Sequence, residues 1–128
     1  MKTLGLIGGT SWVSTAEYYK LLNQMVTERL GGYNAARLLL HSVNFAEYKK
    51  LADERNTAEI TRRLVRIAQT LEGAGAEAIV LCANTMHLAA AEVRTSTGIR
   101  YGVSRLRSCV SQRSQPITGC TPCARAAS

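Results

Sequence analysis

The alternation of short apolar runs with helical patterns is the feature that most constrains how this chain can fold. Three runs are rich in Leu, Ile or Val, are bounded by glycine or polar residues, and are too short to be helices. They span residues 3–9, 36–43 and 77–82. Strands that alternate with helices imply right-handed crossovers, and therefore a mainly parallel sheet with helices on its faces. The predicted fold class is a three-layer α/β domain.

Helix signals between the apolar runs support this fold class. Ser14 with Glu17, and Asn56 with Glu59, fit the capping-box pattern at a helix start. Apolar residues then recur every three or four positions, and glycines end each pattern. The expected helices span residues 14–30, 45–54, 56–73 and 86–96.

The length of 128 residues suits one domain with a single core, which would bury about 65–70% of the unfolded chain's surface. No run of about 18 apolar residues occurs, so a membrane span is excluded, and the apolar start is too short for a secretory signal. We therefore expect a cytoplasmic protein. In a reducing compartment, its four cysteines are expected to be free thiols, metal ligands or catalytic groups rather than disulfides.

The net charge of +7 is concentrated towards one end of the chain. Residues 1–99 hold 11 basic and nine acidic residues, whereas residues 100–128 hold five arginines and no acidic residue. The larger part is thus nearly neutral, like an ordinary globular surface. Charge therefore does not predict a nucleic-acid partner.

Polar residues follow two of the predicted strands. The first set is Gly8, Gly9, Thr10 and Ser11, and the second is Cys82, Ala83, Asn84 and Thr85. Because parallel strands end at one edge of a sheet, and ligands collect beyond their carboxyl ends, we expect both sets to form one site.

Three segments carry a resemblance to a known family. MKTLGLIGGTSWVSTAEYY, RLLLHSVNFAE and EAIVLCANTMH, in this order and spacing, resemble the aspartate/glutamate racemases, which use no cofactor. The resemblance covers about residues 1–99. It implies a fold of two similar α/β domains with the active site between them, each contributing one catalytic cysteine. The chain then represents the N-terminal domain of a truncated racemase.

Inverting an amino-acid α-carbon requires a base on one face and an acid on the other. A thiol with an ordinary pKa of about 8.5 can serve in either role once its environment brings the thiolate within reach. The resemblance identifies Cys82 as the first of the two catalytic thiols. Without the resemblance, Cys82 is interpreted as a small buried core residue, because this is the commoner role of a cysteine that ends an apolar strand.

The resemblance also implies the substrate-binding residues. Asn84 and Thr85, with the backbone amides of the following helix, are expected to hold the substrate carboxylate. Gly9, Thr10 and Ser11 are expected to bind the other end, since glycine allows close backbone approach. The family usually has Met at the position of Thr10 and often Glu at that of Val13. The loop therefore does not predict which substrate side chain is recognised.

Other candidate sites are weaker. We interpret His87 as a packing or capping residue and His41 as a core histidine. The turn after the first strand lacks the G-x-G-x-x-G spacing of a dinucleotide site. We expect no cofactor and no metal.

Residues 100–128 lack helical or strand periodicity, and we expect a basic irregular tail, disordered or translated out of frame. Losing one base from a sequence that encodes Ile-Pro-Leu-Trp, which the family has here, gives the residues from Ile99 onward. Cys120 and Cys123 have C-x-x-C spacing, with Cys109 as a third candidate ligand, but a fourth is missing. The Gly-Cys-Thr at 119–121 matches the family's second cysteine segment by coincidence, because no strand precedes it.

Three functions remain open. The first is an amino-acid racemase acting on a free amino acid, here with little or no turnover. The second is a non-catalytic fragment that binds small carboxylates, and the last is a nucleic-acid-associated protein acting through its arginine tail. An uncovered apolar face also leads us to expect self-association, with a homodimer as one outcome.

Overall fold

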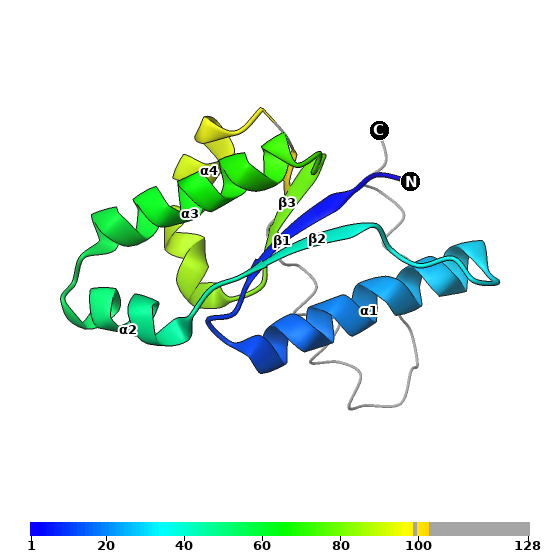
Figure 1. Cartoon of the computed structure of the whole chain (residues 1–128), viewed down its shortest axis with the longest axis horizontal. Coiled ribbons are helices and arrows are strands. Elements are labelled where there is room, and N and C mark those ends of the chain that lie inside the picture. Colours follow the sequence, from blue (N-terminus) through cyan, green and yellow to red (C-terminus); the bar gives the residue numbers. More distant parts are fainter. Residues whose placement is uncertain (99, 103–128) are drawn as a thin grey trace, which may run out of the picture.

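The computed structural model of the chain describes residues 1–98 and 100–102. Its sheet has four parallel strands in the order β2-β1-β3-β4 (Figure 1). The strands are β1 (Leu4–Gly8), β2 (Leu38–Ser42), β3 (Ala78–Leu81) and β4 (Arg100–Gly102). The predicted α/β class and the three predicted strands are confirmed.

Helices cover both faces of this sheet. They are α1 (Trp12–Leu30), α2 (Phe45–Asp53), α3 (Thr57–Gly73), the 3-10 helix η1 (Asn84–Ala89) and α4 (Ala90–Ser96). Figure 1 shows α1 on one side of the sheet and α3 with α4 on the other, which is the layering that right-handed crossovers produce. None of the helices among the described residues is both long and apolar enough to cross a membrane.

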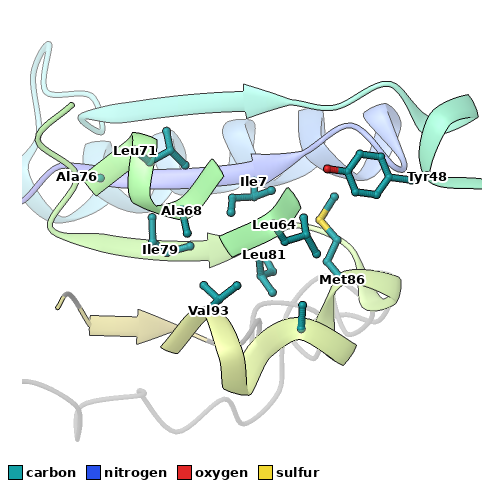
Figure 2. Close-up of a cluster of buried hydrophobic side chains, with 11 residues drawn as sticks. Ile7, Tyr48, Leu64, Ala68, Leu71, Ala76, Ile79, Leu81, Met86 and Val93 are labelled. Atoms are coloured by element: carbon teal, nitrogen blue, oxygen red, sulfur yellow. The ribbon is translucent and has the colours of Figure 1, made fainter. Parts of the chain in front are cut away.

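The larger part of the core lies between the sheet and α3 (Figure 2). Leu64, Ala68 and Leu71 of α3 are buried there against Ile7 and Ile79. These three leucine and alanine positions belong to the stripe that helical spacing predicts, and Asn56 caps the helix as expected, its side-chain oxygen accepting from the Glu59 amide at 3.2 Å. A smaller cluster of Leu6, Tyr18 and Cys82 lies on the α1 side.

Three predicted boundaries differ from the structure. Helix α1 begins earlier than Ser14, because Ser11 caps it by accepting a hydrogen bond from the Ser14 amide at 3.4 Å. The predicted helix at 86–96 begins as η1 and becomes α-helical only at Ala90. Strand β4 falls at the start of the segment expected to be irregular, pairing with β3.

The rest of that segment, residues 103–128, lies outside the described part of the chain, together with Cys109, Cys120 and Cys123. The division into a domain at 1–99 and a tail at 100–128 therefore stays a prediction.

Candidate active site

The loop after β1 is fixed by close backbone packing. Gly9 has a φ of 100°, and a Cβ added to it would lie 2.2 Å from the Val43 carbonyl oxygen and 2.5 Å from the Val43 nitrogen. The Val43 amide also donates to the carbonyl of Gly8 at 2.8 Å. Only glycine combines this backbone conformation with this proximity, so the sequence Gly-Gly at the end of β1 sets the path of the loop.

Thr15 ties the same loop to the first turn of α1. Its hydroxyl accepts from the Gly9 amide at 3.0 Å and donates to the Ser11 carbonyl at 3.0 Å. Thr15 is itself buried. The Gly9 N–H is therefore already used within the protein, and the predicted role of Gly9, Thr10 and Ser11 in binding a substrate stays a prediction.

Thr10 brings an unsatisfied polar atom to the loop. Its hydroxyl oxygen is buried and has no hydrogen-bond partner among the described residues. Leaving such a group unpaired costs about 1–3 kcal/mol, which a ligand with a donor or acceptor would recover. Ser11, in contrast, is exposed and engaged in capping α1.

Cys82 follows β3 directly and is connected to the other loop through hydrogen bonds. Its amide donates to the Ile7 carbonyl at 2.9 Å, and the Ser14 hydroxyl donates to the Cys82 carbonyl at 3.1 Å. The residue is 1% exposed and packs against Leu6 and Tyr18. The structure thus brings together Cys82 and the start of α1, as the sheet topology predicts.

Burial dominates the electrostatics of this thiol. Desolvation raises the pKa of Cys82 to about 12, because a thiolate in an apolar surrounding loses its hydration. At neutral pH the group is a protonated thiol. With this pKa the thiol is a weak acid, and it takes part in proton transfer only if a bound cation or a rearrangement stabilises the thiolate.

Asn84 and Thr85 begin η1, and the structure describes their backbone but not their side chains. No side chain caps this helix, and the Met86 amide donates to the Ala83 carbonyl at 3.2 Å. The predicted role of Asn84 and Thr85 in binding a carboxylate stays a prediction. The helix that follows Cys82 is a six-residue 3-10 turn, so it offers a weaker dipole than the α-helix expected there.

The two histidines are not members of the buried cluster that holds Cys82. His87 is half-buried within η1. His41 is exposed at the end of the edge strand β2, so the core interpretation of it is wrong. Among residues 1–98 and 100–102, no three His, Cys, Asp or Glu side chains are grouped to hold a metal ion.

Sequence reasoning missed three residues that build this site: Ser14, Thr15 and Tyr18. Ser11 was the available signal for the true start of α1, since a serine there can cap a helix as well as the predicted cap, Ser14, can. Nothing local in the sequence indicates that Thr15 holds Gly9 or that Tyr18 covers Cys82, because both contacts arise only when α1 folds back on β1.

Large apolar side chains remain exposed beyond the carboxyl ends of the strands. Trp12 and Val13 begin α1, Phe45 begins α2, and Leu88 lies in η1; Trp12 is 73% and Leu88 74% exposed. We call these four residues the apolar rim. Exposed apolar groups that share one edge are typical of a surface that another unit covers, and further exposed apolar side chains lie elsewhere, at Met1, Tyr19, Leu30, Tyr33 and Leu40.

The fold and this site define a parallel α/β protein with a buried thiol at the carboxyl edge of its central strands. The sequence model of the Asp/Glu/Hydantoin racemase family matches residues 7–99, and the chain belongs to that family. The resemblance drawn from the three sequence segments is thereby confirmed.

Two solved structures are similar to the chain. A Yersinia pestis protein assigned to the Asp/Glu racemases is 38% identical, with a TM-score of 0.80. An aspartate racemase homologue from Pyrococcus horikoshii OT3 is 30% identical, with a TM-score of 0.73. Each match covers 89% of this chain and 50% of the other, so the chain spans about half the length of both proteins.

Proposed function

We propose that this chain is an amino-acid racemase unit in which Cys82 transfers the proton at the substrate α-carbon. The observation that carries the proposal is the position of the Cys82 thiol, at the carboxyl edge of β3 and linked through Ser14 to the Gly9–Ser11 loop. Membership of the racemase family supports it. Thr10, whose buried hydroxyl has no partner in the described structure, supplies a polar contact for the substrate.

The raised pKa means that Cys82 is a protonated thiol in the free protein. Reaching a thiolate at pH 7.5 from a pKa of about 12 costs on the order of 6 kcal/mol. The α-ammonium group of a bound amino acid reduces this cost, because a cation within about 4–6 Å favours the thiolate. Substrate binding, rather than the free site, is therefore what activates Cys82 as a base.

Inversion needs a second proton-transfer group on the opposite face of the α-carbon. Cys82 is the one free cysteine among the described residues. We propose that a second α/β unit supplies the other group and covers the apolar rim in doing so. The twofold greater length of the related structures supports this arrangement.

The test is hydrogen exchange at the α-carbon. The chain is incubated in D₂O with the L and D forms of aspartate and glutamate, and deuterium incorporation and enantiomer ratio are followed by NMR and chiral chromatography. We expect slow incorporation into one enantiomer with little net inversion, since a single thiol serves one face. Cys82→Ser is expected to abolish the incorporation.

Cys123→Ser is the matched control, since it removes a thiol from the same chain outside the described residues. Incorporation that persists in Cys82→Ser, or that both variants lose equally, would contradict the assignment. Absence of exchange with all four substrates would also count against it, and saturable binding without exchange would favour the second candidate, a non-catalytic carboxylate-binding protein. That candidate is favoured by the high pKa of Cys82.

The apolar rim makes a separate prediction about association. The double variant Trp12→Gln, Leu88→Gln is expected to shift the chain from dimer towards monomer, because two large exposed apolar groups are removed from one edge. Sedimentation velocity over a concentration series measures the shift. Tyr33→Gln is the control, since Tyr33 is fully exposed but lies beyond the far end of α1. A wild-type chain that stays monomeric throughout would refute self-association through the rim.

A further inference from the structure

A hollow lies away from the thiol, on the α3 side of the sheet. It has a volume of about 390 Å³ and is bounded by the end of β2, the start of α2 and the outer turns of α3. In Figure 1 these three elements meet at one end of the molecule. Cys82 instead packs on the α1 side, against Leu6 and Tyr18. The hollow is thus a different site from the one assigned to the substrate.

Two arginines of α3 line this hollow, which we call the groove, and they differ in whether a carboxylate pairs with the guanidinium. Arg63 is held by two carboxylates: its Nε lies 2.8 Å from Glu59 Oε1 and its Nη1 lies 3.4 Å from Glu47 Oε2. Hydrogen bonds from Arg62 and Arg63 lower the pKa of Glu59 to about 2, so this carboxylate stays charged and keeps Arg63 occupied. Arg66, about one turn further along α3, is exposed: its backbone carbonyl accepts from the Thr70 hydroxyl at 2.9 Å, whereas its guanidinium has no hydrogen bond or ion pair with any described residue.

The acidic side of the groove is already neutralised. Among the described residues that line it, Glu47 is the one carboxylate, and Arg63 pairs with it. The positive charge of Arg66 is therefore left without a counter-charge on the groove surface. A guanidinium in this position presents several N–H donors in a planar arrangement that matches carboxylate and phosphate oxygens.

The remaining polar groups of the groove add donors. The side-chain oxygen of Asn44 accepts from the Ala46 amide at 3.1 Å, which turns its NH₂ group into the free half of the amide. Tyr48 is 7% exposed, and its ring belongs to the core cluster, with the hydroxyl drawn at the end of the ring in Figure 2. Burial raises the pKa of Tyr48, so the phenol stays protonated and can donate. His41 lies at the same strand end.

We propose that this groove binds a small oxyanion, a carboxylate or phosphate group, with Arg66 as its main ligand and Asn44 and Tyr48 as further donors. The site is separate from the proposed racemase site. The two share one segment, because Ser42 and Val43 line the groove and also lie against the backbone of Gly9. An anion bound in the groove therefore contacts the same strand end that holds the Gly9 loop in place.

The experiment titrates the full 128-residue chain with inorganic phosphate and, separately, with succinate at constant ionic strength, and follows amide chemical shifts. We expect saturable shifts centred on residues 41–48 and 63–70. Whichever probe binds more tightly identifies the anion as phosphate or carboxylate. Arg66→Gln is expected to weaken binding about tenfold or more, since it removes a charge-assisted contact. Arg66→Lys, which keeps the charge but loses the planar donor pair, should fall between the two.

Arg94→Gln is the matched control, because Arg94 is an exposed helical arginine of α4 outside the groove. Equal weakening by Arg66→Gln and Arg94→Gln would reduce the effect to general surface charge and overturn the proposal. Shifts confined to residues 9–11 and 82–86 would place the anion in the racemase site and overturn it too. Cys82→Ser is expected to leave binding unchanged, which separates this proposal from the proposed function.

Discussion

Replacing Gly9 by alanine is expected to destabilise the protein by about 2–6 kcal/mol, combining backbone strain with overpacking. Gly9 has a φ of 100°, and the added Cβ would lie 2.2 Å from the Val43 carbonyl oxygen. This neighbour is backbone and cannot rotate away, so β2 must move or the loop must leave its position. Movement of the loop breaks the hydrogen bond from the Gly9 amide to Thr15, and movement of the β2 end breaks the one from the Val43 amide to the Gly8 carbonyl. Urea denaturation followed by circular dichroism measures the loss.

Gly31→Ala is the control, because it places a side chain at a glycine with positive φ where no neighbouring atom collides with the added Cβ. Gly31 also has a positive φ, of 69°, but no atom lies within 4 Å of its added Cβ. Its substitution is expected to cost about 1–3 kcal/mol, because at φ 69° and ψ −179° the backbone lies in a region that essentially only glycine occupies. If both variants lost the same stability, the packing of Gly9 against Val43 would not be what fixes the loop. Gly9→Ala should also abolish any α-proton exchange, because Thr10 and Ser11 move with the loop.

The layers of the fold follow from local information. The stripe of α3 and its cap at Asn56 both depend on spacing within one helix, and the buried side chains Leu64, Ala68 and Leu71 agree with that spacing. Strands of four or five residues, each ended by glycine or polar groups, leave little choice but crossovers through helices. The α/β class and the common edge for the two loops therefore need no knowledge of long-range contacts.

The details of the site depend on contacts that sequence periodicity does not contain. The start of α1 is set by Ser11, and Ser14 is used instead to hold the Cys82 carbonyl, 68 positions away. The exposure of His41 follows from the place of β2 at the sheet edge, which depends on strand order rather than on the residues of β2. The residues next to Cys82 in the sequence predict a site that contains this thiol. The pKa of Cys82 depends instead on how Leu6 and Tyr18 enclose the side chain.

This enclosure makes the two interpretations of Cys82 compatible. The residue is a core side chain by burial, with 1% of its surface exposed, and it lies at the strand end where the family resemblance expects a catalytic thiol. A desolvated thiol is a poor base in the free protein and a better one beside a substrate cation. The proposed function therefore requires that substrate binds, and that a second unit closes over the apolar rim, before Cys82 acts.

Alkylation of Cys82 by iodoacetamide is expected to be about a thousandfold slower at pH 7.5 than alkylation of an unperturbed thiol, because the reagent requires the thiolate. The rate should rise about tenfold per pH unit well beyond pH 9, since burial raises the pKa of Cys82 to about 12. Mass spectrometry of the peptide that contains Cys82 separates it from the three other cysteines. The same peptide, alkylated in urea, is the internal control and should react at the ordinary rate.

The same pKa shift links Cys82 to stability. A group whose pKa is higher in the folded state contributes its stabilisation fully below its unfolded pKa of about 9, and this contribution is lost as pH rises towards about 12. The free energy of unfolding is therefore expected to fall between pH 8 and pH 10 more steeply for the wild type than for Cys82→Ala, in which no thiol titrates. Parallel pH dependence in the two proteins, or alkylation that levels off near pH 8.5, would mean that the thiol is open to water and that burial does not control its proton.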